Sequence, residues 1–222
     1  IRAMTGAVLV SASLASILGG LWTWSVLLAI LFYVGCQEAR KALKAADPEQ
    51  SSAEVYLKGM VMVALPVAGL FFIGWRGQAY DAALPLGWFV LLWTNDTAAY
   101  LIGRRFGRHR LAPSISPGKT WEGWAGGAMA TLAVAYGLLG VSQGVASLTA
   151  GQWAVLGAVV SVFGPMGDLL ESALKRQAGI KDSGTILPGH GGVLDRFDSH
   201  FISAPVSYTH LTLPTTSGVL GA

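Results

Sequence analysis

Forty-five consecutive residues, from Gly123 to Gly167, include no Asp, Glu, Lys or Arg. A charge-free stretch of this length can supply two helices that cross a bilayer, because each crossing takes about 20 apolar residues. Over the whole chain of 222 residues, 53% are hydrophobic and only 12% are charged. These features exclude an ordinary soluble domain and predict an all-α, polytopic integral membrane protein.

The uncharged segments predict about six membrane spans. In the first of these segments the pair Gly19-Gly20 favours a hairpin of two short spans, with one long tilted helix as the alternative. The predicted spans are Gly6–Leu18, Leu21–Gly35, Leu57–Trp75, Ala82–Gly103, Gly123–Val141 and Gly151–Gly167. Tryptophans near several predicted ends are typical of residues that anchor helices at the membrane interface.

The basic residues indicate on which side of the membrane the loops lie. Lys and Arg concentrate in the loops 37–56 and 104–121 and in a third segment with Lys175, Arg176 and Lys181, and two predicted spans separate each from the next. The positive-inside rule therefore places all three on the cytoplasmic side. The formal net charge of +3 is too small and too dispersed for a nucleic-acid-binding surface.

Sixteen of the 27 charged residues lie in two short segments, Asp96–Glu122 and Asp168–Asp198. The second segment directly follows the charge-free stretch and begins with two carboxylates, a hydroxyl and an ammonium group on one helical stripe. This stripe consists of Asp168, Glu171, Ser172 and Lys175. Pairs such as Glu171 and Lys175 also occur on solvated helix ends, so the stripe alone leaves a structural role open.

A glycine-rich segment with two further aspartates follows the stripe. Asp195 and Asp198 lie one helical turn apart, and they can share a divalent cation with Asp168 if the loop folds back. Magnesium binds such hard oxygen ligands together with substrate phosphates. The glycines on both sides of His190 let backbone N–H groups approach an anion closely. The alternatives are an ordinary turn and a surface cluster of ion pairs.

The first charged segment begins inside a predicted span with Asp96. An ionised side chain at that depth costs roughly 2.5 to 3.5 kcal/mol, so we expect Asp96 to face a cavity or a partner. The sequence Gly118-Lys119-Thr120 suggests a P-loop, but Pro113 stands where that motif requires glycine. Lys119 and the neighbouring hydroxyl groups can still hold phosphate, with an interfacial anchoring loop as the alternative. Together the two segments suit phosphoryl or nucleotidyl transfer to a lipid.

Four blocks of the sequence resemble conserved segments of the phosphatidate cytidylyltransferase family, also called CDP-diacylglycerol synthases. They are Asp96–Tyr100, Ser116–Gly123, Gly167–Ser172 and Ser172–Asp198. The last block is long and specific, and it contains Ser172-Ala-Leu-Lys175-Arg176, Lys181-Asp182-Ser-Gly and Leu187-Pro188-Gly-His190-Gly191-Gly192-Val-Leu-Asp195-Arg196-Phe-Asp198. The resemblance is close over Leu84–Val206.

The resemblance implies transfer of CMP from CTP to phosphatidic acid, with CDP-diacylglycerol and pyrophosphate as products of this step in phospholipid biosynthesis. It also implies a homodimer in the bacterial inner membrane, an active site that faces the cytoplasm, and Mg²⁺ as cofactor with K⁺ beside it. The implied catalytic and metal-binding residues are Asp168, Glu171, Lys175, Asp195 and Asp198. The implied substrate-binding residues are Asp96, Ser116, Lys119, Thr120, Glu122, Ser172, Arg176, Lys181, Asp182, His190, Gly191 and Arg196.

We divide the chain into N-terminal transmembrane helices in 1–83, a catalytic membrane domain in 84–206 and a tail in 207–222. The tail is rich in Thr and interrupted by Pro214, so we expect it to be unstructured and foreign to the family, and the chain to be truncated. Two other functions remain as alternatives. A CTP-dependent polyprenol or dolichol kinase shares the nucleotide, and an ion-coupled transporter uses intramembrane carboxylates such as Asp96.

Overall fold

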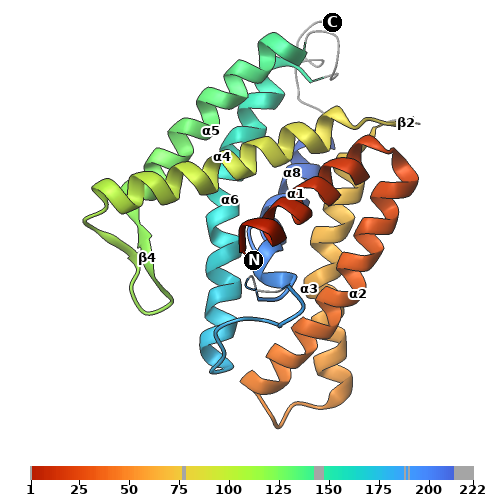
Figure 1. The fold of residues 1–222 in the computed structure, drawn as a ribbon, viewed down its shortest axis with the longest axis vertical. Helices are drawn as coiled ribbons and strands as arrows, with labels where there is room; N and C mark the ends of the chain where they lie inside the picture. The colour runs from red at the N-terminus through yellow and green to blue at the C-terminus, as the bar shows by residue number, and fades with distance from the viewer. Residues whose placement is uncertain (1, 77–78, 143–147, 188, 190, 213–222) are drawn as a thin grey trace, which may run out of the picture.

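The computed structural model describes residues 2–76, 79–142, 148–187, 189 and 191–212, and it is mostly helical (Figure 1). These residues form eight helices and two short antiparallel hairpins. The helices are α1 (Arg2–Leu18), α2 (Leu21–Ala46), α3 (Ser52–Ile73), α4 (Ala83–Phe106), α5 (Trp121–Ser142), α6 (Ala150–Gln177), α7 (Leu194–Phe197) and α8 (His200–Thr212). The strands are β1 (Trp75–Arg76), β2 (Ala79–Tyr80), β3 (Arg110–Ala112) and β4 (Ser116–Thr120).

The first uncharged segment forms two helices and not one, as the glycine pair predicted. Gly20 adopts a φ of 97°, a left-handed conformation that glycine tolerates far better than other residues. Helix α2 then continues to Ala46, well past the predicted end at Gly35. Most of the predicted loop 37–56 is therefore helical, because the segment after Gln37 is rich in Ala, Leu, Lys and Glu, which favour helix.

Three helices in the described part of the chain are long and apolar enough to cross a membrane, namely α2, α3 and α6. The prediction of a helical membrane protein is confirmed at this level, but six spans are not shown. Helix α1 is one reason for the smaller number. It has only 17 residues and is about 26 Å long at 1.5 Å per residue, shorter than the hydrocarbon core of roughly 30 Å.

Helix α8 connects the N-terminal helices to the rest of the bundle. Helices α2 and α3 pack together, α4 packs along α5, and α8 contacts both α3 and α6 (Figure 1). At the α3–α8 contact, a Cβ atom added to Gly69 would lie 2.6 Å from the backbone nitrogen of Pro205. The two helices therefore approach backbone to backbone at this point.

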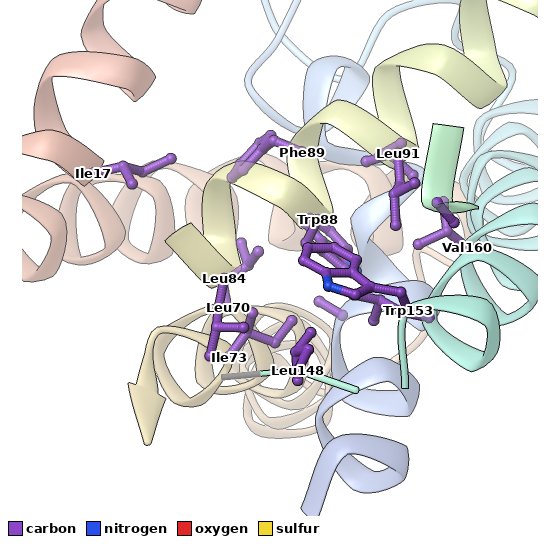
Figure 2. Packing of buried hydrophobic residues seen from close by; sticks show 14 of the residues in the cluster. Ile17, Leu70, Ile73, Leu84, Trp88, Phe89, Leu91, Leu148, Trp153 and Val160 are labelled. Atoms are coloured by element: carbon purple, nitrogen blue, oxygen red, sulfur yellow. The ribbon is translucent and has the colours of Figure 1, made fainter. Parts of the chain in front are cut away.

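A single large apolar core extends across the N-terminal and C-terminal helices. It includes Leu70 of α3, Trp88 of α4, and Trp153 and Val160 of α6, each at most 2% exposed. Figure 2 shows these side chains within the cluster. Because α3 and α8 share this core with α4 and α6, residues before and after position 84 pack as parts of one body.

The structure corrects the expectation that the chain becomes unstructured at residue 207. Helix α8 continues to Thr212, and Ser207 is fully buried within it. The Ser207 hydroxyl accepts a 2.9 Å hydrogen bond from the indole Nε1 of Trp88. Polar Ser and Thr residues suggested a tail, but here a buried partner satisfies the hydroxyl. The predicted tail from residue 213 onward lies outside the described residues.

Substitution of Gly69 by Leu tests the close packing of α3 on α8. We expect the free energy of unfolding in detergent to fall by about 1 to 3 kcal/mol, because a side chain at this position overlaps the backbone of α8. Gly137→Leu on α5 is the matched control, because among the described residues no atom outside its own stretch of helix lies within 4 Å of a Cβ atom built there. Equal unfolding midpoints for the two variants would contradict the contact.

Candidate active site

The C-terminal half of α6 forms one wall of the candidate site. Asp168, Ser172 and Lys175 lie on the predicted helical stripe, and each contacts a different segment or a neighbour on that stripe. The β3–β4 hairpin contacts this wall through Lys119. The segment that contains Asp195 folds back onto α6, which is the condition for Asp195 and Asp198 to approach the stripe. The predicted stripe therefore brings together residues that are distant in the sequence.

Lys175 joins two buried carboxylates. Its Nζ atom lies 2.6 Å from Glu171 Oε2 and 2.7 Å from Asp195 Oδ1, and the Glu171 and Asp195 side chains are 2% and 4% exposed. The second Asp195 oxygen accepts hydrogen bonds from the backbone N–H groups of Ser183, at 2.9 Å, and Gly192, at 2.7 Å. Burial alone would raise the pKa of Asp195, but Lys175 and these two N–H groups outweigh it and lower the pKa.

The glycine-rich turn is shaped to fit the Asp195 carboxylate. Gly191 has a φ of 79°, and a Cβ atom there would lie 2.5 Å from Asp195 Oδ2. The backbone N–H of Gly192 approaches an anion here, and that anion is a side chain of the protein, so the predicted approach to a bound anion stays a prediction. His190 itself lies outside the described residues.

Lys119, near the end of β4, contacts α6 at Pro165 and Asp168, before Ser172 and Lys175 in the helix. Its Nζ atom lies 2.6 Å from Asp168 Oδ2 and donates a 3.3 Å hydrogen bond to the carbonyl oxygen of Pro165. The other oxygen of Asp168 accepts a 3.2 Å hydrogen bond from the Ser172 hydroxyl. The hairpin has a second contact with α6, where Arg176 Nε donates to the carbonyl oxygen of Ile115 at 3.3 Å.

Asp198 lies against α6 beside Asp168. A Cβ atom on Gly167 would lie 2.5 Å from the carbonyl oxygen of Asp198, so only glycine permits this approach. Ser199 then links two carboxylates, with its hydroxyl 3.4 Å from Asp198 Oδ1 and 3.4 Å from Asp96 Oδ2. Burial, and next the negative charge of Asp168, raise the pKa of Asp198 to about 7.

The group formed by Asp96, Asp168 and Asp198 contains three carboxyl groups, and among the described residues a lysine pairs with only one of them. Lys119 is the lysine that pairs with Asp168. In the described part of the chain, no group of three His, Cys, Asp or Glu side chains is arranged to hold a metal ion by itself. Mg²⁺ often binds through one or two carboxylates, with water and substrate phosphates as its other ligands. Asp168 and Asp198 fit that smaller requirement.

Eight of the predicted site residues form two neighbouring groups. Asp96, Lys119, Asp168, Ser172 and Asp198 form the first group. Glu171, Lys175 and Asp195 form the second. Glu171 interacts electrostatically with both Asp195 and Asp198, so the groups adjoin. In this structure Asp195 does not share one cluster with Asp168 and Asp198, and the predicted common metal site stays a prediction.

Several predicted substrate-binding residues have structural partners. Thr120 accepts a hydrogen bond from the backbone of Gly123 at the start of α5. Glu122 lies 2.6 Å from His109 Nδ1 and accepts hydrogen bonds from the backbone N–H groups of Arg108 and His109, so it fixes the turn after α4. Ser116 pairs with Ala112 in the β3–β4 hairpin. The exposed residues of the set are Asp96, Arg176, Lys181, Asp182 and Arg196.

Two residues of this region, Ser199 and Glu38, were not predicted from the sequence. Ser199 directly follows the Asp198 block, and this adjacency was the only available signal. Glu38 of α2 binds the glycine-rich segment through contacts that span about 150 positions of the chain. Neither its spacing nor its sequence neighbours indicate such a contact.

The fold and the site define a helical membrane protein with a polar site built from carboxylates, lysines and a glycine-rich turn. The chain belongs to the cytidylyltransferase family, whose model matches residues 49–213. It is 47% identical over 149 residues to the phosphatidate cytidylyltransferase of Staphylococcus aureus (strain COL), a match that covers 66% of this chain and 55% of that protein.

A second relative is the phosphatidate cytidylyltransferase of Brucella suis biovar 1 (strain 1330). The identity is 46% over 156 residues, which cover 64% of this chain and 55% of that protein. The chain thus spans about half the length of the curated relatives that it matches. Family membership is therefore established, and the relatives named here are bacterial.

Substitution of Gly191 by Ala tests the fit between the turn and Asp195. Alanine at a positive φ costs about 1 to 2 kcal/mol, and the new methyl group also displaces the Asp195 carboxylate. Gly179→Ala is the matched control, because Gly179 has a φ of 66° but, beyond its chain neighbours, no atom of the described residues lies within 4 Å of a Cβ atom built there. We expect the Gly191 variant to show the larger drop in unfolding midpoint. Identical drops would show that the Asp195 contact is not tight.

Proposed function

We propose that the protein is a phosphatidate cytidylyltransferase, which transfers CMP from CTP to phosphatidic acid and releases pyrophosphate. The observation that carries this proposal is the match of residues 49–213 to the cytidylyltransferase family, a segment that contains both groups of the candidate site. The relatives bear the name of this activity. The arrangement of carboxylates next to lysines supports a reaction between two phosphate compounds.

The reaction joins two polyanions and needs no general base. A phosphate monoester has a second pKa near 6, so the phosphate of phosphatidic acid is largely a dianion at neutral pH. One of its oxygens attacks the α-phosphorus of CTP, and the bond from this phosphorus to the pyrophosphate oxygen breaks. The barrier lies in charge repulsion and in orientation, which positioned cations reduce.

In the proposed complex, the lysines and arginines at the end of α6 and on the β3–β4 hairpin bind the phosphates. Lys119 and Lys175 are held in place by carboxylates, so their ammonium groups are ordered before substrate binds. Arg176 and Lys181 are exposed, and in the proposed complex they bind the triphosphate or the lipid phosphate. Ordered cations of this kind need less reorganisation during the reaction.

Asp168 and Asp198 would hold Mg²⁺, with Asp96 linked to Asp198 through Ser199 and with Asp195 in the adjoining group. When bound, Mg²⁺ supplies positive charge to the phosphate oxygens and to the leaving pyrophosphate. The carboxylates position that charge at the end of α6, and Ser199 and Ser172 orient two of them through hydrogen bonds. We further propose that this end of the bundle faces the cytoplasm, where CTP is found, because the basic loops lie there by the positive-inside rule.

Asparagine substitutions test the roles of Asp195 and Asp198. We expect each of Asp195→Asn and Asp198→Asn to lower Mg²⁺-dependent formation of CDP-diacylglycerol by at least 100-fold, because each removes a charge that the site requires. The measurement is incorporation of labelled CTP into extractable lipid by detergent-purified protein. Glu49→Gln, at an exposed position between α2 and α3, is the control. Near-normal turnover in both aspartate variants would refute the assignment.

The raised pKa of Asp198 predicts how metal binding depends on pH. Below about pH 7 this carboxyl group holds a proton that Mg²⁺ must displace, and above it the carboxylate is free to bind. The Mg²⁺ concentration that gives half of the maximal thermal stabilisation should therefore be several-fold higher at pH 5.5 than at pH 8. Asp198→Asn should reduce that difference. A half-saturating concentration that does not change between these pH values would exclude Asp198 as a ligand.

A further inference from the structure

Glu38 is a buried carboxylate without a cationic partner in the described part of the chain. It belongs to α2 and is 2% exposed. Its oxygens accept hydrogen bonds from the backbone N–H groups of Val193, at 3.1 Å, and Leu194, at 2.9 Å, and from the Ser183 hydroxyl, at 3.2 Å. A buried charge is costly unless such donors compensate it, so these hydrogen bonds fix the segment firmly relative to α2.

The segment that Glu38 holds is the one that holds Asp195. Ser183 donates its hydroxyl to Glu38 and its backbone N–H to Asp195. Gly192 donates to Asp195, and the next two residues donate to Glu38. Both ends of the glycine-rich segment therefore donate hydrogen bonds to the same two carboxylates, Glu38 of α2 and Asp195 of α7.

Glycines of this segment leave space for the Glu38 side chain. A Cβ atom on Gly192 would lie 2.5 Å from Glu38 Oε2, and a Cβ atom on Gly184 would also overlap the Glu38 carboxylate. The Glu38 carboxylate therefore packs closely against both Gly184 and Gly192. A shift of the α2 carboxylate must move the segment, and with it the N–H groups that orient Asp195.

We propose that Glu38 is a positioning residue of the active site, which acts through Ser183 and residues 192–194 to orient Asp195 and, through Asp195, Lys175. The inference rests on the proposed function for its effect on catalysis. It assigns α2 to the catalytic unit, although the match to the family model begins only at residue 49. None of the hydrogen bonds described for Glu38 involves a candidate substrate-binding residue on the β3–β4 hairpin. Substitution of Glu38 should therefore change kcat and the half-saturating Mg²⁺ concentration more than the KM for phosphatidate.

The test uses the whole chain with Glu38→Gln and Glu38→Ala, and Glu49→Gln as the exposed control. The first readout is hydrogen–deuterium exchange of peptides that cover residues 183–197, which requires no activity. The second is kcat, the KM for phosphatidate and the half-saturating Mg²⁺ concentration.

We expect amide exchange in 183–197 to accelerate at least tenfold in Glu38→Ala and less in Glu38→Gln, because the amide oxygen can still accept one hydrogen bond. The value of kcat should fall in the same order, by at least tenfold for Ala, while the KM for phosphatidate stays within twofold and the half-saturating Mg²⁺ concentration rises. If Glu38→Ala does not fold, Glu38→Gln decides by the same criteria.

Two results would overturn the inference. Exchange equal to that of Glu49→Gln would show that Glu38 does not hold the segment, whatever the activity. Faster exchange with unchanged kcat and unchanged Mg²⁺ use would show a purely structural contact. Absence of CDP-diacylglycerol with the unsubstituted chain would instead refute the proposed function, and exchange would still decide whether Glu38 positions the segment.

Discussion

The structure depends on how carboxylates are neutralised where the apolar helix α6 ends. Lys119 pairs with Asp168 at 2.6 Å, and Lys175 lies between Glu171 and Asp195 at 2.6 and 2.7 Å. Burial of these acids is favourable only with cations and N–H donors next to them. The pairing therefore dictates where the β3–β4 hairpin and the glycine-rich segment can lie. Neither of these lysine pairs includes Asp198, and the pKa of its carboxyl group rises to about 7. An added cation would stabilise the ionised form of this carboxyl group.

The elements of the fold that are local in sequence could be predicted, and those that depend on distant contacts could not. The apolar stretches predicted helices, and the glycine pair before Leu21 predicted the break between α1 and α2. The extension of α2 to Ala46 was missed because the positive-inside argument treats a basic segment as a loop, although Lys and Arg are good helix formers. Six spans were predicted from uncharged apolar segments, and three helices in the described part of the chain meet the combined criteria of length and hydropathy.

The same division applies to the candidate site. Helical periodicity predicted the stripe from Asp168 to Lys175, and the structure brings Asp195 and Asp198 to that stripe. Periodicity could not show that Asp195 binds Lys175 and backbone N–H groups, while Asp198 adjoins Asp168. Glu38 carried no signal, because its partners are about 150 positions away. Family resemblance also offered no help at Glu38, since the matched segment starts after it.

The most direct test of the account compares CTP labelled at the α-phosphorus with CTP labelled at the γ-phosphorus. Purified protein is incubated with each nucleotide, phosphatidate and Mg²⁺, and the lipid is then extracted. Transfer of CMP predicts that the α label enters the lipid and the γ label leaves as pyrophosphate. Entry of the γ label into lipid, or entry of neither label, would contradict the central claim that this site joins CMP to phosphatidic acid.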